Sequence, residues 1–480
     1  MTNELGRSVA VVGSGPNGLM AAVVLAGAGC DVTVFEAASE PGGGLRTAEL
    51  TVPGARHDVC SAIHPLAVGS PAFRSLRADL ERHGLRWVHS PLPLAHPLDG
   101  RRAAVLRRGV DDTADGLGVD AAAWRRLFGP LVDAGDDLID GLLSPFSIPP
   151  AHPLTMARFG LPGIRSASSL AGARFDGEEA AALFAGLAGH SILPLSDAIT
   201  AGYGLMLGAL AHHVGWPLAE GGSASIAAAL VGLLAERGGR VECNRRIESL
   251  AELDRFDDVL LDVTPRQLLA IGGDRLPARY RGALERYRYG AGVFKLDLAL
   301  SEPIPWADPD VGRAATVHLG GTLAEIAESE QAVGACRHAD RPYVLLAQQS
   351  RFDRTRAPDG IETVWAYCHV PNGSTVDMTA RIEDQIERFA PGFRDTIVAR
   401  HTMNTEAMER HDANYIGGDI NGGLGDLRQF VIRPHLSLRP WRTPLPGVYL
   451  CSSSTPPGGG VHGMCGRHAA HALLRDRRRR

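Results

Sequence analysis

The sequence predicts an α/β protein in which a helix-covered parallel sheet is interleaved with a second, α+β domain. Three observations carry this prediction. A strand, a glycine-rich turn, a helix and a second strand fill the first 36 residues, and a helix followed by strands recurs over residues 223–263. A strand followed by a glycine-rich helix start lies at residues 448–474. We expect these three segments to form one discontinuous domain, because strands that alternate with helices build parallel sheets.

The N-terminal elements are the clearest. Residues 8–12 (SVAVV) are typical of a short apolar strand, and residues 31–35 (DVTVF) are typical of a second buried strand. Between them, residues 19–28 (LMAAVVLAGA) predict a helix that ends at Gly29.

The turn after the first strand has the spacing of a dinucleotide-binding fingerprint. Gly13 allows a tight turn, Gly15 lets the backbone approach a pyrophosphate, and Gly18 allows the helix to pack closely on the strand. Glu36, at the end of the second strand, is placed to accept hydrogen bonds from a ribose diol, which argues against NADP. The helix N-terminus favours a phosphate, and the whole turn consists of Gly13, Ser14, Gly15, Pro16, Asn17 and Gly18.

The remaining elements divide the chain into two domains. The central return contains a helix over residues 223–237 and strands over residues 240–243 and 259–263. Residues 1–70, 218–300 and 411–480 are assigned to the cofactor domain, and residues 71–217 and 301–410 to the substrate domain. Within the latter, we expect helices over residues 121–143, 177–187 and 378–389 and strands over residues 343–348 and 363–369.

The C-terminal segment carries the second strong signal. Residues 448–451 predict a buried strand, and Gly458, Gly460 and Gly463 precede an Ala-rich helix with the spacing of a second fingerprint. No further strand that ends in an acidic residue follows, so this segment is interpreted as a glycine-lined helix start that meets a phosphate or a cofactor carbonyl.

Residues 36–46 (EAASEPGGGLR), together with the first turn and residues 456–463 (PPGGGVHG), resemble the phytoene desaturase and amine oxidase flavoproteins. The similarity is greatest to the phytoene-desaturase-like branch that includes the pyridine nucleotide-disulfide oxidoreductase domain protein of mitochondria. This resemblance implies a Rossmann-type FAD-binding domain of the GR2-like kind and non-covalent FAD. The chain departs from many relatives at Gly44, Ser452 and Pro456, where they carry Arg, Gly and His.

The fingerprint and the resemblance together nominate a set of cofactor-binding residues. Ile247 is implied to bring its backbone beside the adenine, and Val461 to lie under the flavin. Ser453 is assigned a hydrogen bond to phosphate. The full set is Gly13, Ser14, Gly15, Pro16, Asn17, Gly18, Glu36, Ala37, Gly43, Gly44, Arg46, Ile247, Ser453, Gly460, Val461 and Gly463.

Lys295 is the catalytic candidate and the single lysine of the sequence. It stands in an alternating apolar strand over residues 293–300, followed by EPIPW. The resemblance to amine oxidases implies that a lysine here holds a water at flavin N5, a role that suits a compact ammonium group. The alternatives are a surface lysine or a salt bridge.

Histidines and cysteines offer weaker candidates. No spacing of His, Cys or acidic residues matches a metal site, and the seven irregularly spaced cysteines argue against a disulfide framework. A lone histidine more often packs than catalyses. Minor acid–base candidates in the substrate domain are His190, His212, His213, His318 and His369.

Composition excludes several function classes. The 480 residues are 45% hydrophobic and carry a formal net charge of −5, so neither disorder nor a general affinity for nucleic acid is encoded. We expect no transmembrane helix and no signal peptide, hence a cytoplasmic protein, and the preference for Arg over Lys points to a GC-rich bacterial genome. The oligomeric state is left open.

The function expected from this sequence is FAD-dependent transfer of a hydride from a C–H bond of a largely apolar small molecule to the flavin. The flavin would be reoxidised by oxygen or another carrier, because no NAD(P)H-binding domain is recognised in the sequence. A flavin amine oxidase is one alternative. A flavin-binding scaffold with little turnover is the other.

Overall fold

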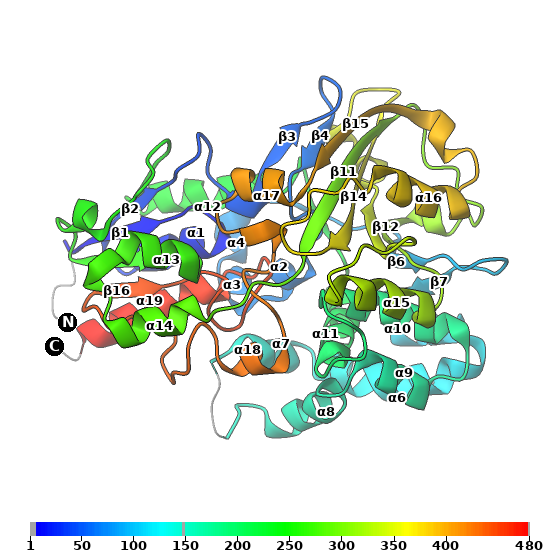
Figure 1. The fold of residues 1–480 in the computed structure, drawn as a ribbon, viewed down its shortest axis with the longest axis horizontal. Coiled ribbons are helices and arrows are strands. Elements are labelled where there is room, and N and C mark those ends of the chain that lie inside the picture. The colour runs from blue at the N-terminus through cyan, green and yellow to red at the C-terminus, as the bar shows by residue number, and fades with distance from the viewer. Residues whose placement is uncertain (1–5, 146–148, 479–480) are drawn as a thin grey trace.

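The computed structural model describes residues 6–145 and 149–478. Within this part of the chain, two sheets stand side by side (Figure 1). The five-stranded sheet and its helices lie at the left of the view, and the seven-stranded sheet lies at the upper right above a group of helices. None of the described helices is long and apolar enough to cross a bilayer.

The five-stranded sheet is parallel and is assembled from three distant parts of the chain. Its strand order places the last strand of the chain at one edge and β9 at the other. In sheet order, the strands are β16 (Val448–Leu450), β10 (Asp258–Leu261), β1 (Ser8–Val12), β2 (Asp31–Phe35) and β9 (Arg240–Glu242).

Both faces of this sheet are buried, as in other parallel sheets. Val9 and Val11 of β1 pack with one group of helices, whereas Ala10 and Val12 pack with the other, because successive side chains point to opposite faces. The first group is α1 (Pro16–Gly27), α12 (Ala224–Glu236) and α19 (Met464–Arg477), and the second is α13 (Pro265–Gly272) and α14 (Ala278–Glu285).

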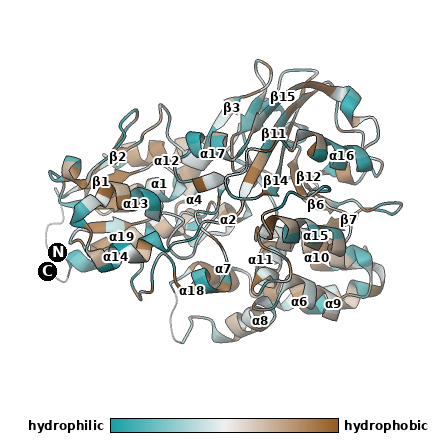
Figure 2. Ribbon diagram, in the orientation of Figure 1, coloured by the Kyte–Doolittle hydropathy of each residue, from teal (hydrophilic) through white to brown (hydrophobic). Residues whose placement is uncertain are grey.

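The seven-stranded sheet is mostly antiparallel, with one parallel pair between β12 and β6. Figure 2 shows its central strands as hydrophobic ribbons and α16 (Thr379–Phe389) as a largely hydrophilic helix on the outside. The strands in sheet order are β15 (Ile397–Met403), β11 (Gly292–Leu300), β14 (Glu362–Val370), β13 (Val344–Ala347), β12 (Ala314–Leu319), β6 (Leu92–His96) and β7 (Ala104–Leu106).

The strand β11 differs from the predicted division of the chain. Residues 218–300 were assigned to the cofactor domain, yet residues 292–300 pair along their length with β14 and β15 of the seven-stranded sheet. An apolar strand pattern does not reveal its pairing partner, because register and partner are set by tertiary packing.

A layer of helices supports the second sheet. The sequence predicted one helix over residues 121–143, which is wrong: the chain breaks at Gly135, whose φ of +51° interrupts the helix. The helices are α6 (Ala121–Asp133), α7 (Asp136–Leu143), α8 (Pro153–Gly163), α9 (Ala167–Arg174), α10 (Glu178–Gly189), α11 (Thr200–His213) and α15 (Leu323–Gly334).

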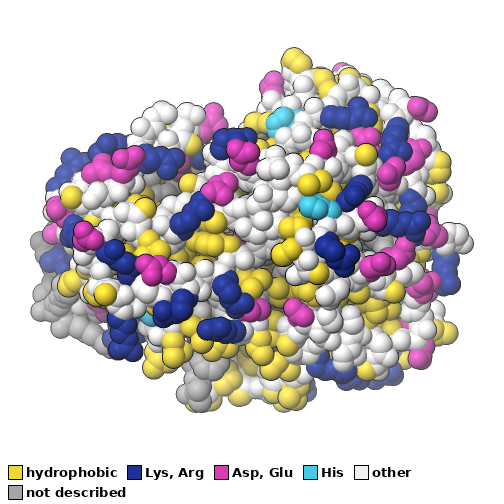
Figure 3. Space-filling view, viewed as in Figure 1, with side chains coloured by type: hydrophobic (Ala, Val, Ile, Leu, Met, Phe, Trp, Pro, Cys, Tyr) yellow, Lys and Arg dark blue, Asp and Glu magenta, His cyan; other side chains and the backbone are white. Residues whose placement is uncertain are grey.

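Short elements join these layers. Two-stranded sheets pair β3 (Thr47–Glu49) with β4 (Arg56–Asp58) and β5 (Trp87–Val88) with β8 (Leu218–Ala219). The short helices are α2 (Pro65–Gly69), α3 (Pro71–Ser75), α4 (Arg77–Arg82), α5 (Val110–Asp115), α17 (Thr405–His411) and α18 (Leu427–Val431). On the surface, hydrophobic side chains gather along the lower edge of the view in Figure 3.

Candidate functional site

The glycine turn after β1 is packed too tightly for side chains. Gly13 has a φ of +98°, and a Cβ there would lie 2.9 Å from the carbonyl oxygen of Asp262. A Cβ on Gly18 would lie 2.2 Å from the carbonyl oxygen of Gly13. Helix α1 therefore starts directly against the turn, with its first N–H groups directed toward the space beyond the strand ends.

Polar groups from both ends of the chain meet at the start of α1. The side chain of Asn17 is buried, and its Nδ2 lies 3.4 Å from Oγ of Ser453, 436 residues away. Its Oδ1 has no hydrogen-bond partner. A helix N-terminus beside a buried amide with spare hydrogen-bonding capacity fits a phosphate group.

The carboxylate of Glu36 organises the end of β2. Its Oε2 accepts hydrogen bonds from the N–H of Ser14 at 3.1 Å and from the Ser14 hydroxyl at 2.5 Å, and its Oε1 accepts one from Ala38 N–H at 2.8 Å. Arg46 donates to Glu36 Oε1 at 3.2 Å and to the carbonyl of His411 at 3.1 Å. Arg46 thus holds Glu36 in place at the carboxyl end of β2.

Gly43 and Gly44 pack back onto this turn. A Cβ on Gly43, whose φ is +54°, would lie 3.1 Å from the Cα of Gly15. A Cβ on Gly44 would lie 2.2 Å from the hydroxyl oxygen of Tyr415. The backbone of this segment therefore forms a wall that admits no larger residue.

Ile247 lies in the hydrophobic cluster beside β2. Its side chain packs in the same cluster as Phe35 and does not line the cavity. Its segment still runs along the Glu36 end of the site, since Arg245 N–H donates to the carbonyl of Glu36 at 2.8 Å.

The C-terminal glycines have two different places. Gly460 and Val461 line the central cavity, whereas Gly463 precedes α19 with a φ of +67° and packs against Met20 of α1. A Cβ on Gly466 would lie only 1.9 Å from the carbonyl oxygen of Asn17. Helix α19 is therefore seated on the first turn of α1.

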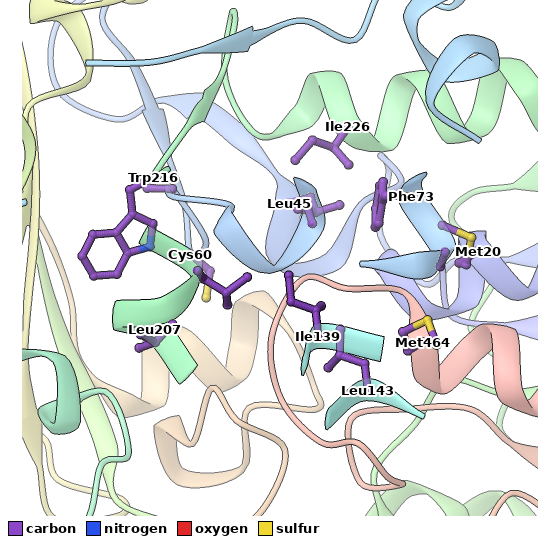
Figure 4. Close-up of a cluster of buried hydrophobic side chains, with 14 of the residues drawn as sticks. Met20, Leu45, Cys60, Phe73, Ile139, Leu143, Leu207, Trp216, Ile226 and Met464 are labelled. Atoms are coloured by element: carbon purple, nitrogen blue, oxygen red, sulfur yellow. The ribbon is translucent and has the colours of Figure 1, made fainter. Parts of the chain in front are cut away.

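A cavity of about 270 Å³ lies between the two sheets, at the carboxyl ends of β1 and β10. Predicted residues on its wall are Gly15, Pro16, Asn17, Gly44, Ser453, Gly460 and Val461. Figure 4 shows the buried cluster beside it, with Leu207 and Trp216 at one end and Met20 and Met464 at the other. The carboxyl ends of parallel strands are the usual place for ligands in such sheets.

Asp262, which was not among the residues predicted from the sequence, lines the cavity beside the glycine turn. It follows β10, and its Oδ2 accepts a hydrogen bond from Gly18 N–H at 2.8 Å. Burial raises the pKa of Asp262, the nearby carboxylates of Asp412 and Glu36 add to the rise, and the hydrogen bond from Gly18 opposes it, so that the pKa is about 8. The signal in the sequence was an acid directly after the strand VLLD, at the ligand-binding edge.

Lys295 is buried, with a 1% exposed surface, and its ammonium group is paired with Asp297 two residues along β11. Lys295 does not line the cavity. It stands directly opposite Tyr367 on β14, and Tyr367 lines the cavity. Burial would raise the pKa of Asp297, but Lys295, His401 and His57 hold it below its usual value. Lys295 therefore forms a salt bridge, as one of the alternatives from the sequence has it. The pair lies on β11, next to the strand β14 that carries Tyr367 of the cavity wall.

The end of the cavity away from the glycine turn is uncharged. Burial lowers the pKa of His190 to about 3 and that of His64 to about 4, so both are neutral near pH 7. The acids on the cavity wall, Asp262 and Asp412, lie at the glycine-turn end. The far end is lined by Leu207, Trp216, Thr316, Leu345, Trp365 and Tyr367.

The other histidine candidates lie around this end or far from it. His318 bonds His190 at 2.9 Å between the two Nε2 atoms, and His369 bonds Glu330 at 2.7 Å. His212 accepts from Trp124, and His213 contacts Asp136 at the surface. Among the described residues, no group of three His, Cys, Asp or Glu side chains could hold a metal ion.

Comparisons with known proteins agree with this architecture. Residues 11–80 match the family model of the NAD(P)-binding Rossmann-like domain. The chain is 26% identical over 551 aligned positions to mouse pyridine nucleotide-disulfide oxidoreductase domain-containing protein 2, covering 97% of this chain and 93% of the relative. It is 24% identical to the lycopene-forming phytoene desaturase of Pseudescherichia vulneris, over 56% of this chain and 58% of that one.

A solved structure with the same fold is putrescine oxidase bound to putrescine, with a TM-score of 0.63 at 18% identity, covering 99% of this chain and all of the other. The chain thus shares the overall fold of an amine oxidase whose structure is solved. In sequence, it is homologous to pyridine nucleotide-disulfide oxidoreductase domain-containing protein 2 and to phytoene desaturase.

Proposed function

We propose that this protein is an FAD-dependent oxidoreductase that removes a hydride from a C–H bond of an uncharged, largely apolar organic substrate. The observation that carries the proposal is the cavity itself, which joins a phosphate-binding helix start at one end to an uncharged aromatic wall at the other. An anion-binding helix start and an apolar wall thus border one cavity, as contact between a dinucleotide and an apolar molecule requires.

The residues at the first end fit FAD. The glycine turn and the first N–H groups of α1 would hold the pyrophosphate, with Asn17 and Ser453 beside it. Glu36 would accept hydrogen bonds from the ribose hydroxyls, in exchange for its present bond to the Ser14 hydroxyl. Gly44, Gly460 and Val461 would form the wall against the flavin.

When bound, the flavin supplies the hydride acceptor N5 and can return its electrons to oxygen or another carrier. The protein's own part is to orient the substrate and keep water away. Leu207, Leu345 and Trp216 offer apolar surface, and the neutral imidazole of His190 stands at the wall. The buried groups Trp365 Nε1 and Thr316 Oγ1 have no hydrogen-bond partner, so they can orient one polar group of the substrate.

Lys295 is proposed to act on the flavin from its position beside Tyr367. Its charge lies on the cavity side of the sheet, because directly opposed residues of an antiparallel pair share a face. A positive charge near N5 would favour the reduced flavin, with Asp297 holding the ammonium group in place.

A flavin amine oxidase is the second candidate, and one observation favours it. The rings of Trp365 and Tyr367 meet edge to face at 4.9 Å, and both line the cavity. Aromatic faces attract ammonium groups. Against this, no carboxylate lies at the far end of the cavity wall to pair with a substrate cation.

An anaerobic screen of flavin absorbance separates the candidates. We expect polyenes, fatty acyl compounds or cyclic ketones to bleach the visible absorbance of the bound flavin, and primary amines to leave it unchanged. Bleaching by amines alone would replace the desaturase by an amine oxidase. Flavin that stays oxidised with every class would favour a scaffold with little turnover, and protein purified without FAD would overturn the cofactor assignment.

A further inference from the structure

A second concave site adjoins the segment of residues 420–422, which lines the cavity. It is a groove of about 620 Å³ between α14 and the segment of residues 427–438, which contains α18. The two sites share a wall: the hydroxyl of Tyr287, which lines the groove, donates a 2.6 Å hydrogen bond to the carbonyl of Gly422, which lines the cavity.

The groove is strongly basic. Its wall has no carboxylate and includes Arg279, Arg286, Arg288 and Arg428. Arg288 pairs with Asp426 at 2.6 Å, just outside the groove. Within residues 6–145 and 149–478, no ion pair is formed by the other three arginines, so their charges are available to an anion.

Two further polar groups on the wall have spare hydrogen-bonding capacity. The side chain of Tyr280 is more than nine-tenths buried, and its hydroxyl has no hydrogen-bond partner. Nδ1 of His435 is also buried without a partner, and its ring meets Tyr280 edge-on at 5.0 Å. Buried polar groups are rarely left without a partner, so these two atoms indicate a ligand with hydrogen-bonding oxygens.

The rim of the groove is unusually apolar for a protein surface. Exposed fractions reach 57% for Phe430, 67% for Val431, 75% for Leu436 and 97% for Leu438. Residues 427–442 contain no acidic residue. In Figure 3, arginine and hydrophobic side chains lie next to each other at this lower edge, where α8 also exposes Leu154 and Leu161.

We propose that this groove and its rim bind the surface of an anionic phospholipid bilayer. The arginines and the Tyr280 hydroxyl would hold a headgroup phosphate, while the rim side chains enter the boundary between headgroups and acyl chains. A free phosphate compound satisfies the arginines but gives no reason for large apolar side chains to face water. Because the whole protein has a net charge of −5, the attraction to an anionic surface comes from the groove and not from the overall charge.

Vesicle sedimentation with the FAD-loaded full-length protein tests the proposal, without substrate and hence independently of the proposed reaction. We expect binding to vesicles containing phosphatidylglycerol and little binding to pure phosphatidylcholine. The triple variant R279Q/R286Q/R428Q should bind at least tenfold more weakly, since each basic residue near the surface contributes appreciably. The matched control R77Q/R126Q/R246Q removes three exposed arginines elsewhere and should bind like the wild type.

A second pair of measurements separates lipid from free phosphate. The variant F430S/L438S keeps every arginine and should also lose vesicle binding, while its flavin spectrum and melting temperature stay at wild-type values. Titration with inorganic phosphate should not compete with the vesicles at millimolar concentration. Equal sedimentation of the triple variant and the matched control would overturn the proposal, and so would tight phosphate binding without vesicle binding.

Discussion

At the scale of single residues, the protonation state of the Asp262 carboxyl group sets the local charge beside the start of α1. Its pKa in the folded protein is about 8, above the ordinary value of 3.8, because the group is buried. Folded protein therefore keeps a proton that unfolded protein loses between about pH 4 and pH 8, and this residue lowers stability as pH rises through that window. Below pH 8 the neutral acid does not repel a phosphate.

This predicts a pH dependence of FAD affinity that depends on one side chain. From pH 7 to pH 9 the wild type should lose about tenfold in affinity, because Asp262 becomes an anion close to the pyrophosphate. Asp262→Asn keeps the shape without the charge and should show a flatter profile. Equilibrium titration of apoprotein with FAD at both pH values measures the difference, and parallel profiles would contradict it.

Glu36 is the second residue with a specific expectation. Glu36→Gln removes the charge that accepts from Ser14 and Arg46, and in the complex from the ribose. A hydrogen bond to a charged group contributes about 1.5–3 kcal/mol, so FAD affinity should fall about ten- to a hundredfold. The exposed neighbour Glu40→Gln is the control and should bind FAD normally. Unchanged affinity in Glu36→Gln would show that the ribose is held elsewhere.

At the scale of elements, strand β11 carries a buried ion pair between Lys295 and Asp297. Lys295→Met alone leaves Asp297 buried without its partner, which costs about 3–5 kcal/mol of the free energy of unfolding. The double variant K295M/D297N removes both charges and should recover most of that loss in urea unfolding.

The same double variant tests the role of Lys295 in the reaction. Stopped-flow measurement of flavin reduction and of reoxidation by oxygen should show at least one slower half-reaction in the folded, FAD-loaded double variant. Wild-type rates in both halves would leave Lys295 as a purely structural ion-pair partner.

The contact between α1 and α19 is a second element-scale feature. Gly466→Ala would force a Cβ to within 1.9 Å of the Asn17 carbonyl, so the two helices must move apart. We expect a loss of about 1–3 kcal/mol in the free energy of unfolding and weaker FAD binding, since Asn17 lies at the helix start. Gly172→Ala, in α9 with open space around its Cβ, is the matched control and should not destabilise the protein. Equal unfolding curves for the two variants would contradict this close packing.

At the scale of the whole molecule, one buried ion pair ties separate segments together. Arg356 donates to Asp58 at 2.8 Å and to the carbonyl of Arg56 at 3.1 Å, and Ser223 N–H donates to the same Asp58 carboxylate. Burial would raise the pKa of Asp58, but Arg356 and Ser223 hold it below 3.8. Because the pKa of Asp58 is lower in the folded protein, its ionised carboxylate stabilises the fold at pH values above 3.8. This stabilisation is lost as the pH falls through the pKa of the folded protein.

Removing the arginine should therefore destabilise the entire fold. Arg356→Met leaves Asp58 unpaired and should lower the free energy of unfolding at pH 7 by about 3–5 kcal/mol. Arg410→Met breaks only the solvent-exposed pair with Glu406 and should cost less than about 1 kcal/mol. Urea unfolding of both variants gives the comparison, and similar small losses would show that the buried pair is not needed for stability.

The sequence by itself determined the parts of this protein that depend on neighbouring residues. The turn from Gly13 to Gly18, the helix after it and the flanking strands follow from local spacing and backbone sterics, and the structure has each of them. The break at Gly135 was missed, because an apolar helical period continues across it.

Only the tertiary structure decided what lies next to these local elements. It placed Asp262 against Gly18, Ser453 beside Asn17, Lys295 on Asp297 instead of on the cavity wall, and β11 in the second sheet. The physical reason is that burial, charge pairing and strand register arise from contacts between residues far apart in the chain, and a periodic pattern carries no record of its partner.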